Sequence, residues 1–206
     1  MGISERKARQ RADLRGRILD AARAIVLEQG FAGLTMRKIA EAIEYSPGTI
    51  YLHFAGRDAI AQELCLGGLA DLAAALEPAS AVAEPRARIE AMAAAYVRFG
   101  LGHPETYRLV LMEDPTIVKA IYEGPDAGGP NDPGARAYGF LASGFLDLAA
   151  AGRLKPGAEP SVLTDAFWVG LHGLVSLKLT CPGFPATPEA VLLPVLIASM
   201  LDGMLV

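Results

Sequence analysis

Side chains that can form hydrogen bonds are concentrated between Thr35 and Phe54, and their types suit contacts with nucleic acid. Hydroxyl groups, a guanidinium and backbone N–H groups beside a glycine are the donors that proteins present to phosphate oxygens and base edges. The residues expected near bases or the adjacent backbone are Arg37, Ser46, Gly48 and Thr49. The residues expected at phosphates are Thr35, Tyr51 and His53. For Arg37 the alternative is an ordinary solvated surface arginine.

Two short helices joined by a tight turn are expected to carry these groups. Thr35 is a good N-cap for the first helix. The apolar face of that helix is Met36, Ile39, Ala40 and Ile43, at helical spacing. Ser46 caps the second helix, and Pro47 suits its first position because the N–H there has no helical partner. The second helix is expected to bury Ile50 and Phe54. A pair of this size places one helix in the major groove of DNA.

The segment from about Leu14 to Leu64 resembles the DNA-binding domain of the TetR (tetracycline-repressor-like) family of bacterial transcription regulators. The matching residues are Ile18, Ala21, Ala22, Gly30, Phe31, Thr35, Ile39, Ala40, Ser46, Pro47, Gly48, Thr49, Ile50, Tyr51, Phe54, Arg57 and Asp58. The resemblance implies an all-α fold. It implies a three-helix helix-turn-helix DNA-binding domain at residues 1–58 and a helical-bundle ligand-binding and dimerisation domain at residues 59–206. It further implies a homodimeric repressor of a palindromic double-stranded DNA operator.

The turn between the two short helices departs from the family pattern. The family often has Gly where this chain has Glu44. A backbone φ above zero is costly for Glu, so a turn of a different type is expected here. Just after the second helix, Arg57 occupies the place where the family has a basic residue. There the helix N-terminus and the guanidinium would both favour a phosphate.

Charge is distributed unevenly along the chain, whose net charge is −4. Residues 1–58 hold ten Lys/Arg and seven Asp/Glu, whereas residues 59–206 hold nine and sixteen. An acidic body repels DNA except through the basic end, which orients the encounter. A basic arm at the start is expected to contact the DNA backbone or minor groove, with a disordered tail as the alternative. Its charges are Arg6, Lys7, Arg9, Arg11, Arg15 and Arg17.

The composition narrows the protein class further. The N-terminus is charged and no run of eighteen apolar residues is free of polar interruption, so no secretory signal or membrane span is expected. Cys65 and Cys181 are too few for a disulfide framework or a structural zinc site. We therefore expect a cytoplasmic protein with two reduced thiols, no metal and no cofactor. Motifs of the common enzyme classes are absent from the sequence, so it is not expected to be an enzyme.

Helical spacing, interrupted by Gly and Pro, continues to the end of the chain. The expected helices, besides the short pair, cover residues 12–29, 57–77, 85–100, 104–112, 115–122, 134–151, 160–180 and 188–203. Residues 78–85 are expected to form a linker, and residues 123–134, rich in Gly and Pro, a mobile loop. The helix at 57–77 begins at the DNA-binding unit, so it is the expected mechanical link to the rest.

The last two expected helices are apolar on more than one side, so each must be buried nearly all round. A body this small cannot cover both, and a second copy of the chain is the expected cover. A fully intramolecular core is the alternative. The resemblance agrees with pairing, since TetR regulators dimerise through a four-helix bundle of their last two long helices. The interface candidates are Leu171, Leu174, Val175, Leu192, Val195 and Leu196.

Trp168, His172 and Gly173 carry a second resemblance, to the TetR subgroup whose C-terminal domain is named for a Trp-His-Gly signature. Trp168 and His172 share one helical face, which Asp165 and Ser176 extend. Such a polar stripe suits the wall of a cavity for a small apolar or aromatic effector. The alternative is a core histidine satisfied by a neighbouring hydroxyl or carbonyl. The other lining candidates are Tyr96, Phe99, Tyr107, Met112, Phe140 and Phe145.

Two other kinds of regulator remain open at this point. A redox regulator would respond through the thiol of Cys65 or Cys181. A ligand-independent regulator would use its C-terminal body only to dimerise or to contact another protein.

Overall fold

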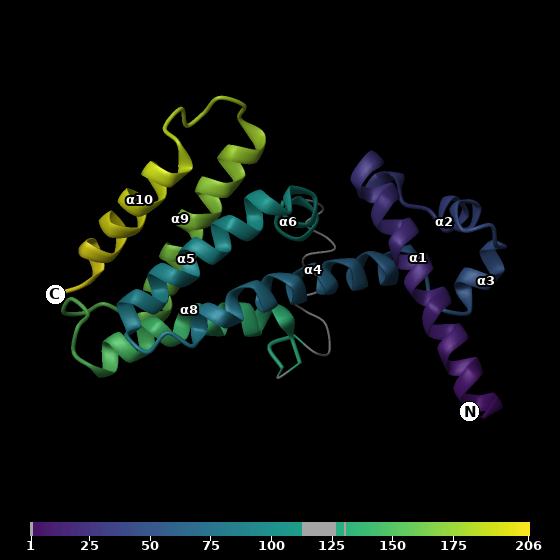
Figure 1. Cartoon of the computed structure of the whole chain (residues 1–206), viewed down its shortest axis with the longest axis horizontal. Helices are drawn as coiled ribbons and strands as arrows, with labels where there is room; N and C mark the ends of the chain where they lie inside the picture. Colours follow the sequence, from purple (N-terminus) through teal and green to yellow (C-terminus); the bar gives the residue numbers. More distant parts are fainter. Residues whose placement is uncertain (1, 113–126, 130) are drawn as a thin grey trace. The chain divides into compact units, whose positions relative to one another are not determined.

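The computed structural model describes residues 2–112, 127–129 and 131–206 (Figure 1). Within these ranges every regular element is an α-helix, apart from one antiparallel bridge between Leu154 and Leu205. The helices are α1 (Ile3–Gly33), α2 (Met36–Ala42), α3 (Pro47–Tyr51), α4 (Arg57–Ser80), α5 (Pro85–Gly102), α6 (Pro104–Leu111), α8 (Pro133–Ala150), α9 (Pro160–Thr180) and α10 (Glu189–Met204). The all-α prediction is confirmed. The helix expected over residues 115–122 lies outside the described residues.

Helices α5, α6, α8, α9 and α10 begin and end within two residues of the predicted limits. A proline stands at the first position of α5, α6, α8 and α9, and a capping side chain precedes it at α5 and α8. Glu84 accepts a hydrogen bond from the N–H of Ala87 (2.6 Å) at the start of α5. At α8 the Asp132 carboxylate accepts from the N–H groups of Gly134 (2.8 Å) and Ala135 (3.2 Å). The described part of the Gly/Pro-rich loop leads directly into this cap.

Two boundaries differ from the prediction. Helix α1 begins at Ile3, not near residue 12, so the basic arm is helical. The Glu5 side chain accepts from the N–H of Gly2 (2.8 Å) and so caps this earlier start. Gly30, at φ 68°, breaks the helix near its predicted end, and one further turn follows. Helix α4 continues through Pro78 to Ser80, because a proline in the last turn forfeits only one backbone hydrogen bond.

The described residues form two compact units, of which unit 1 comprises residues 2–68, 108–112 and 127. There α1 packs on α2 and α2 on α3. The fully buried side chains include Ile18, Ile39, Ile50 and Ile60, which come from different helices, and Leu34 between α1 and α2. Since α2 and α3 are too short to be stable alone, this shared apolar core holds them in place.

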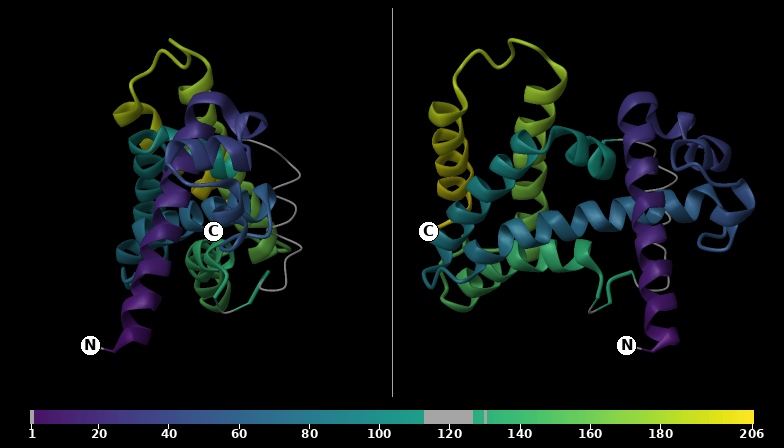
Figure 2. Two further views of the ribbon diagram at one scale, coloured as in Figure 1. Left: turned by 90° about the vertical axis from the view of Figure 1, so that its right-hand side faces the viewer. Right: turned by 45° about the vertical axis from the view of Figure 1, so that its right-hand side comes forward.

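Unit 2 comprises the described residues 69–107, 128–129 and 131–206. Here α5 contacts α8, α9 and α10, while α9 contacts α8 and α10. Helices α9 and α10 lie side by side and run in opposite directions, joined by residues 181–188 (Figure 2). Helices α5 and α8 cross closely at Gly144, where a Cβ atom would lie 2.5 Å from Cγ1 of the buried Ile89.

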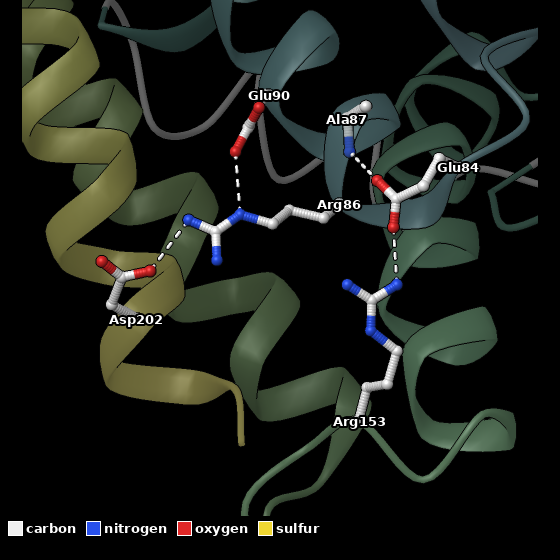
Figure 3. Close-up of polar contacts among 6 residues, drawn as sticks. All are labelled: Glu84, Arg86, Ala87, Glu90, Arg153 and Asp202. Carbon is white, nitrogen blue, oxygen red and sulfur yellow. Dashed lines mark hydrogen bonds and ion pairs between the residues drawn. The ribbon is translucent and has the colours of Figure 1, made fainter.

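Ion pairs surround the start of α5 and tie it to later segments of unit 2 (Figure 3). Arg86 donates to Glu90 (3.0 Å) and to Asp202 of α10 (2.8 Å). Glu84 pairs with Arg153, which follows α8 (2.5 Å). Most of these groups are well exposed, so the pairs orient the helix ends and add little stability.

Candidate functional site

The two capping side chains of the helix-turn-helix form the predicted hydrogen bonds. Thr35 Oγ1 accepts from the N–H of Lys38 (3.2 Å), and Ser46 Oγ accepts from the N–H of Thr49 (3.3 Å). The Ser46 and Thr49 hydroxyl oxygens also lie 3.0 Å apart. Thr35 and Ser46 are exposed and Thr49 is half-buried. The hydroxyls that start the helices therefore also reach the surface of unit 1.

The turn between α2 and α3 corrects the expectation for Glu44. Its φ is 60°, the left-handed conformation that a glycine would adopt, so the turn is not of a different type. The N–H of Tyr45 donates to the carbonyl of Ala40 (2.9 Å), and that of Glu44 donates to the carbonyl of Glu41 (3.3 Å). This pair of bonds is the Schellman motif. Arg17 adds a hydrogen bond to the carbonyl of Ile43 (3.1 Å). The turn thus tolerates a glutamate because its backbone bonds are made.

Arg37 and Arg57 each have one ionic partner among the described residues. Arg37 pairs with Glu41 one turn later (2.7 Å), and its side chain is 84% exposed. Arg57, the first residue of α4, pairs with the exposed Asp58 (2.9 Å). Exposed pairs of this kind are weak in water. Both guanidiniums can therefore exchange a carboxylate for a phosphate or a base at small cost.

Helix α3, the second helix of the pair, is shorter than the sequence predicted. Helix α3 ends at Tyr51, so His53 lies in the following turn and is half-buried, not outward-facing. Its Nδ1 atom is buried and has no hydrogen-bond partner within the described part of the chain. Gly48 and Tyr51 are exposed as predicted. Leu52 is not among the predicted contacts but is 75% exposed, as its position between the buried Ile50 and Phe54 indicates.

Arg15 and Arg17 were expected in a DNA-contacting arm but form contacts within unit 1. Arg15 pairs with Glu63 of α4 and donates to the carbonyl of His53 (2.7 Å). The guanidinium of Arg17 lies 5.4 Å from the ring centre of Tyr45. No sequence signal indicated these partners, because Arg15 and Glu63 are 48 residues apart.

Unit 2 contains a buried chain of hydrogen bonds built from three of the predicted ligand residues. The hydroxyls of Tyr96 and Tyr107 lie 2.8 Å apart, and the Tyr107 hydroxyl lies 2.7 Å from Nδ1 of His172. Both tyrosines are buried. Burial raises the pKa of Tyr107 and lowers the pKa of His172, so the neutral forms are favoured. The hydroxyl partner that the sequence analysis left open for His172 is Tyr107.

Trp168 extends this cluster along α9. Its ring centre lies 5.0 Å from that of Tyr96, edge to face, and 6.2 Å from that of Tyr138. The Tyr138 hydroxyl donates to Asp165 (2.7 Å). Asp165, Trp168 and His172 thus share the face that the sequence predicted.

The other predicted lining residues are not part of this row of contacts. Phe145 is buried against Phe167, at 5.7 Å between ring centres. Phe99 stacks on His103 (5.0 Å), and Phe140 lies under the guanidinium of Arg136. Met112 is half-buried and belongs to unit 1.

The expected dimer interface is corrected at three of its six positions. Leu171, Leu174 and Val175 are buried in the chain's own core, because this face of α9 packs on its neighbours in unit 2. Val195 is exposed, and Leu192 and Leu196 are half-buried. The exposed apolar side chains of α9 and α10 are Val162, Val169, Leu177, Val191 and Val195.

The two thiols differ sharply. Cys65 is buried, lies 3.6 Å from the carbonyl oxygen of Leu109, and burial raises its pKa to about 12. Cys181 is exposed.

Among the described residues no group of three His, Cys, Asp or Glu side chains could hold a metal ion. By length and composition alone α4 and α9 are apolar enough to cross a membrane, but core helices pass the same test and the indication is weak.

Comparison with known proteins matches both parts of the chain. The model of "Bacterial regulatory proteins, tetR family" covers residues 18–64, and that of "Tetracyclin repressor-like, C-terminal domain" covers residues 89–200. The HTH-type transcriptional regulator UidR of Escherichia coli (strain K12) is 44% identical over 52 residues, which are 25% of this chain and 26% of UidR. The match therefore spans about a quarter of that relative's length.

Solved structures share the fold over nearly the whole chain. A TetR family transcription regulator from Marinobacter aquaeolei VT8 is 23% identical, with a TM-score of 0.71 over 96% of this chain and 98% of that one. FadR from Bacillus subtilis, solved in complex with stearoyl-CoA, is 16% identical, with a TM-score of 0.72 over 91% and 97%. At these identities the likeness establishes the fold alone. Because the C-terminal family model by itself covers more than half of the 206 residues, this chain belongs to the TetR family, whose members are DNA-binding transcription regulators and not enzymes.

Proposed function

We propose that this protein is a homodimeric, cytoplasmic transcriptional repressor that leaves a palindromic operator when it binds a small apolar or aromatic effector. DNA reading belongs to residues 1–58, and effector binding and dimerisation to residues 59–206. The observation that carries the DNA-reading part is the pair of capped helices α2 and α3, which leaves Arg37, Gly48 and Tyr51 exposed on unit 1. Repression, rather than activation, follows the tendency of the family.

The groups proposed to contact DNA divide into two roles. Tyr51, Thr35, the guanidinium of Arg57 and the half-buried His53 contact phosphates, where the N-terminus of α4 also favours an anion. Bases or the adjacent backbone are contacted by Arg37 and by three residues at the start of α3, namely Ser46, Gly48 and Thr49. Phosphate contacts set affinity and register, whereas base contacts set the sequence that is read.

Selection of duplexes from random DNA at a stated salt concentration tests this function. A two-fold dimer carries two recognition helices, so the enriched sequences should contain two inverted half-sites about one helical turn apart. Enrichment without any inverted repeat would refute the dimeric reading. No enrichment at all would refute sequence-specific binding.

Dimerisation is supported by the exposed apolar side chains of α9 and α10. Val169, in the middle of α9, is 68% exposed, and Val195 of α10 is 59% exposed. A carboxylate placed in a packed helix interface would be buried without a partner. We expect Val169→Asp to give a monomer in sedimentation experiments and to lose operator binding. Leu146→Asp is the matched control, since Leu146 is 58% exposed on α8, outside the α9–α10 face.

Effector binding is assigned to the face of α9 that carries Trp168 and His172. The same residues support membership of the Trp-His-Gly subgroup, which we propose on this ground. Neutral His172 and the aromatic ring of Trp168 suit an apolar molecule with one or two polar groups. The FadR neighbour was solved with stearoyl-CoA, which makes long-chain acyl compounds a reasonable first probe.

Operator release in the presence of stearoyl-CoA, stearate and an uncharged steroid tests this assignment. An effector should weaken operator binding by the wild-type chain and have no effect on Trp168→Ala, while Leu146→Ala should respond like wild type. If no probe binds or releases the operator, the ligand-independent regulator becomes the favoured alternative.

The redox alternative is narrowed to one thiol. Cys65 is buried with a raised pKa, so it is a poor nucleophile, and only the exposed Cys181 is accessible to an oxidant. If peroxide released the operator from wild type but not from Cys181→Ala, this alternative would replace effector control.

A further inference from the structure

The recognition helix α3 has few means of holding its orientation. It contains five residues, from Pro47 to Tyr51, and so cannot be stable by itself. The buried side chains of Ile50 and Phe54 attach it to the core of unit 1. Apolar contacts are not directional. A directional contact at its end would therefore decide how accurately the exposed groups are placed.

Arg15 of α1 supplies such a contact. Its guanidinium donates to the backbone carbonyl of His53, two residues after α3 ends, at 2.7 Å. The same group lies 4.0 Å above the ring centre of Phe54. It also binds both carboxylate oxygens of Glu63 on α4, with Nε at 3.1 Å from Oε1. One planar side chain thus connects α1, the end of α3 and α4 within unit 1.

We infer that Arg15, oriented by Glu63, is a positioning residue that fixes the recognition helix for base reading and is not itself a DNA contact. A two-oxygen pair holds a guanidinium plane in one orientation, which a lysine cannot reproduce. The side chains of Arg15 and Glu63 are 41% and 34% exposed, so water does not fully screen the pair. The inference rests on the proposed operator binding, because positioning has no meaning without a site to read.

Glu63→Gln separates this role from direct DNA contact. If Arg15 bound phosphate, removing the neighbouring carboxylate would free it and tighten binding to every duplex. If Arg15 positions α3, the same change should weaken binding to the operator while leaving binding to a mixed-sequence duplex unchanged. Loss of one charged hydrogen-bond pair corresponds to roughly a tenfold weakening.

The measurement is fluorescence anisotropy of the full-length protein with a selected operator duplex and a mixed-sequence duplex of equal length, over a range of salt. Arg15→Gln and Glu63→Gln should each lower the operator-to-mixed affinity ratio about tenfold. The double variant should match the single ones, because the two residues act as one unit. Arg15→Lys should recover only part of the ratio.

Arg11→Gln is the matched control on the same helix, since it removes one exposed positive charge. It should weaken binding to the two duplexes equally and reduce the dependence of log affinity on log salt concentration by about one. The inference is overturned if Arg15→Gln behaves like Arg11→Gln, if Glu63→Gln tightens binding, or if the two single effects add. A wild-type chain that binds no selected duplex would instead overturn the proposed function, and this inference with it.

Discussion

Removing the Tyr107 hydroxyl should destabilise the protein far more than removing an equivalent hydroxyl at the surface. Tyr107 is fully buried, and its hydroxyl lies 2.8 Å from that of Tyr96 and 2.7 Å from Nδ1 of His172. Tyr107→Phe deletes both hydrogen bonds and leaves Nδ1 without that partner. The two hydrogen bonds contribute about 1 kcal/mol each, and the nitrogen left without a partner costs up to about 2 kcal/mol. The free energy of unfolding should therefore fall by about 2–4 kcal/mol.

The control is Tyr138→Phe, which also removes one tyrosine hydroxyl. Tyr138 donates to the exposed Asp165 (2.7 Å), and water can replace this partner. We expect Tyr138→Phe to lower the free energy of unfolding by about 0–1 kcal/mol. Both variants should be compared with wild type by denaturant unfolding at one chain concentration, because the proposed dimerisation would make the apparent stability concentration-dependent. In thermal unfolding the Tyr107 variant should melt roughly 4–16 °C lower.

Equal effects of the two substitutions would refute the reasoning. Such a result would mean that water satisfies His172 once the Tyr107 hydroxyl is gone. The cluster would then be a hydrated cavity, not a closed chain of protein hydrogen bonds. The same outcome would strengthen the view that these residues line an effector site.

Three further predictions follow from single positions. Glu44→Gly should raise the free energy of unfolding by about 0.5–1 kcal/mol because it relieves a left-handed φ, whereas Glu44→Ala should not. On α8, Gly139→Ala should stabilise by about 1 kcal/mol since its Cβ meets nothing within 4 Å, while Gly144→Ala should destabilise because its Cβ meets Ile89. Denaturant unfolding measures both pairs. Burial lowers the pKa of His172 in the folded protein. The contribution of the neutral ring to the free energy of unfolding should therefore be full above about pH 6.5 and fall as the pH drops toward the folded-state pKa. In His172→Asn this slope should be smaller between pH 5 and 8.

The sequence predicted those parts of the fold that depend on local chemistry. Thr35, Ser46 and Pro47 act within three residues of themselves, so their caps and helix starts were read correctly. The face shared by Trp168 and His172 follows from a spacing of four. Caps and helical faces are set by neighbours along the chain, and a single sequence contains them.

The errors arise where tertiary structure decides. Helix α9 is apolar on several sides, so its sequence does not indicate which side faces the core. Leu171 was therefore predicted to contact a partner chain, although the chain's own core buries it. The contact of Arg15 with Glu63 joins residues 48 apart, which no local rule predicts. Glu44 keeps the conformation of a glycine because the bonds around the turn hold it there.

The basic run at the start of α1 therefore cannot act on DNA as its composition alone implies. The charge of Arg15 is paired with Glu63 within unit 1, whereas Arg6, Lys7, Arg9, Arg11 and Arg17 are exposed, although Arg17 also donates to the carbonyl of Ile43. Counterion release scales with the phosphates that are neutralised, so this segment can contribute a salt slope of at most about five per chain, not six. The exposed charges lie on a helix, at a rise of about 1.5 Å per residue. A rigid rod of charge can follow the phosphate backbone, but it lacks the extended chain that enters a minor groove. Backbone contact is thus the role that the helical arm supports.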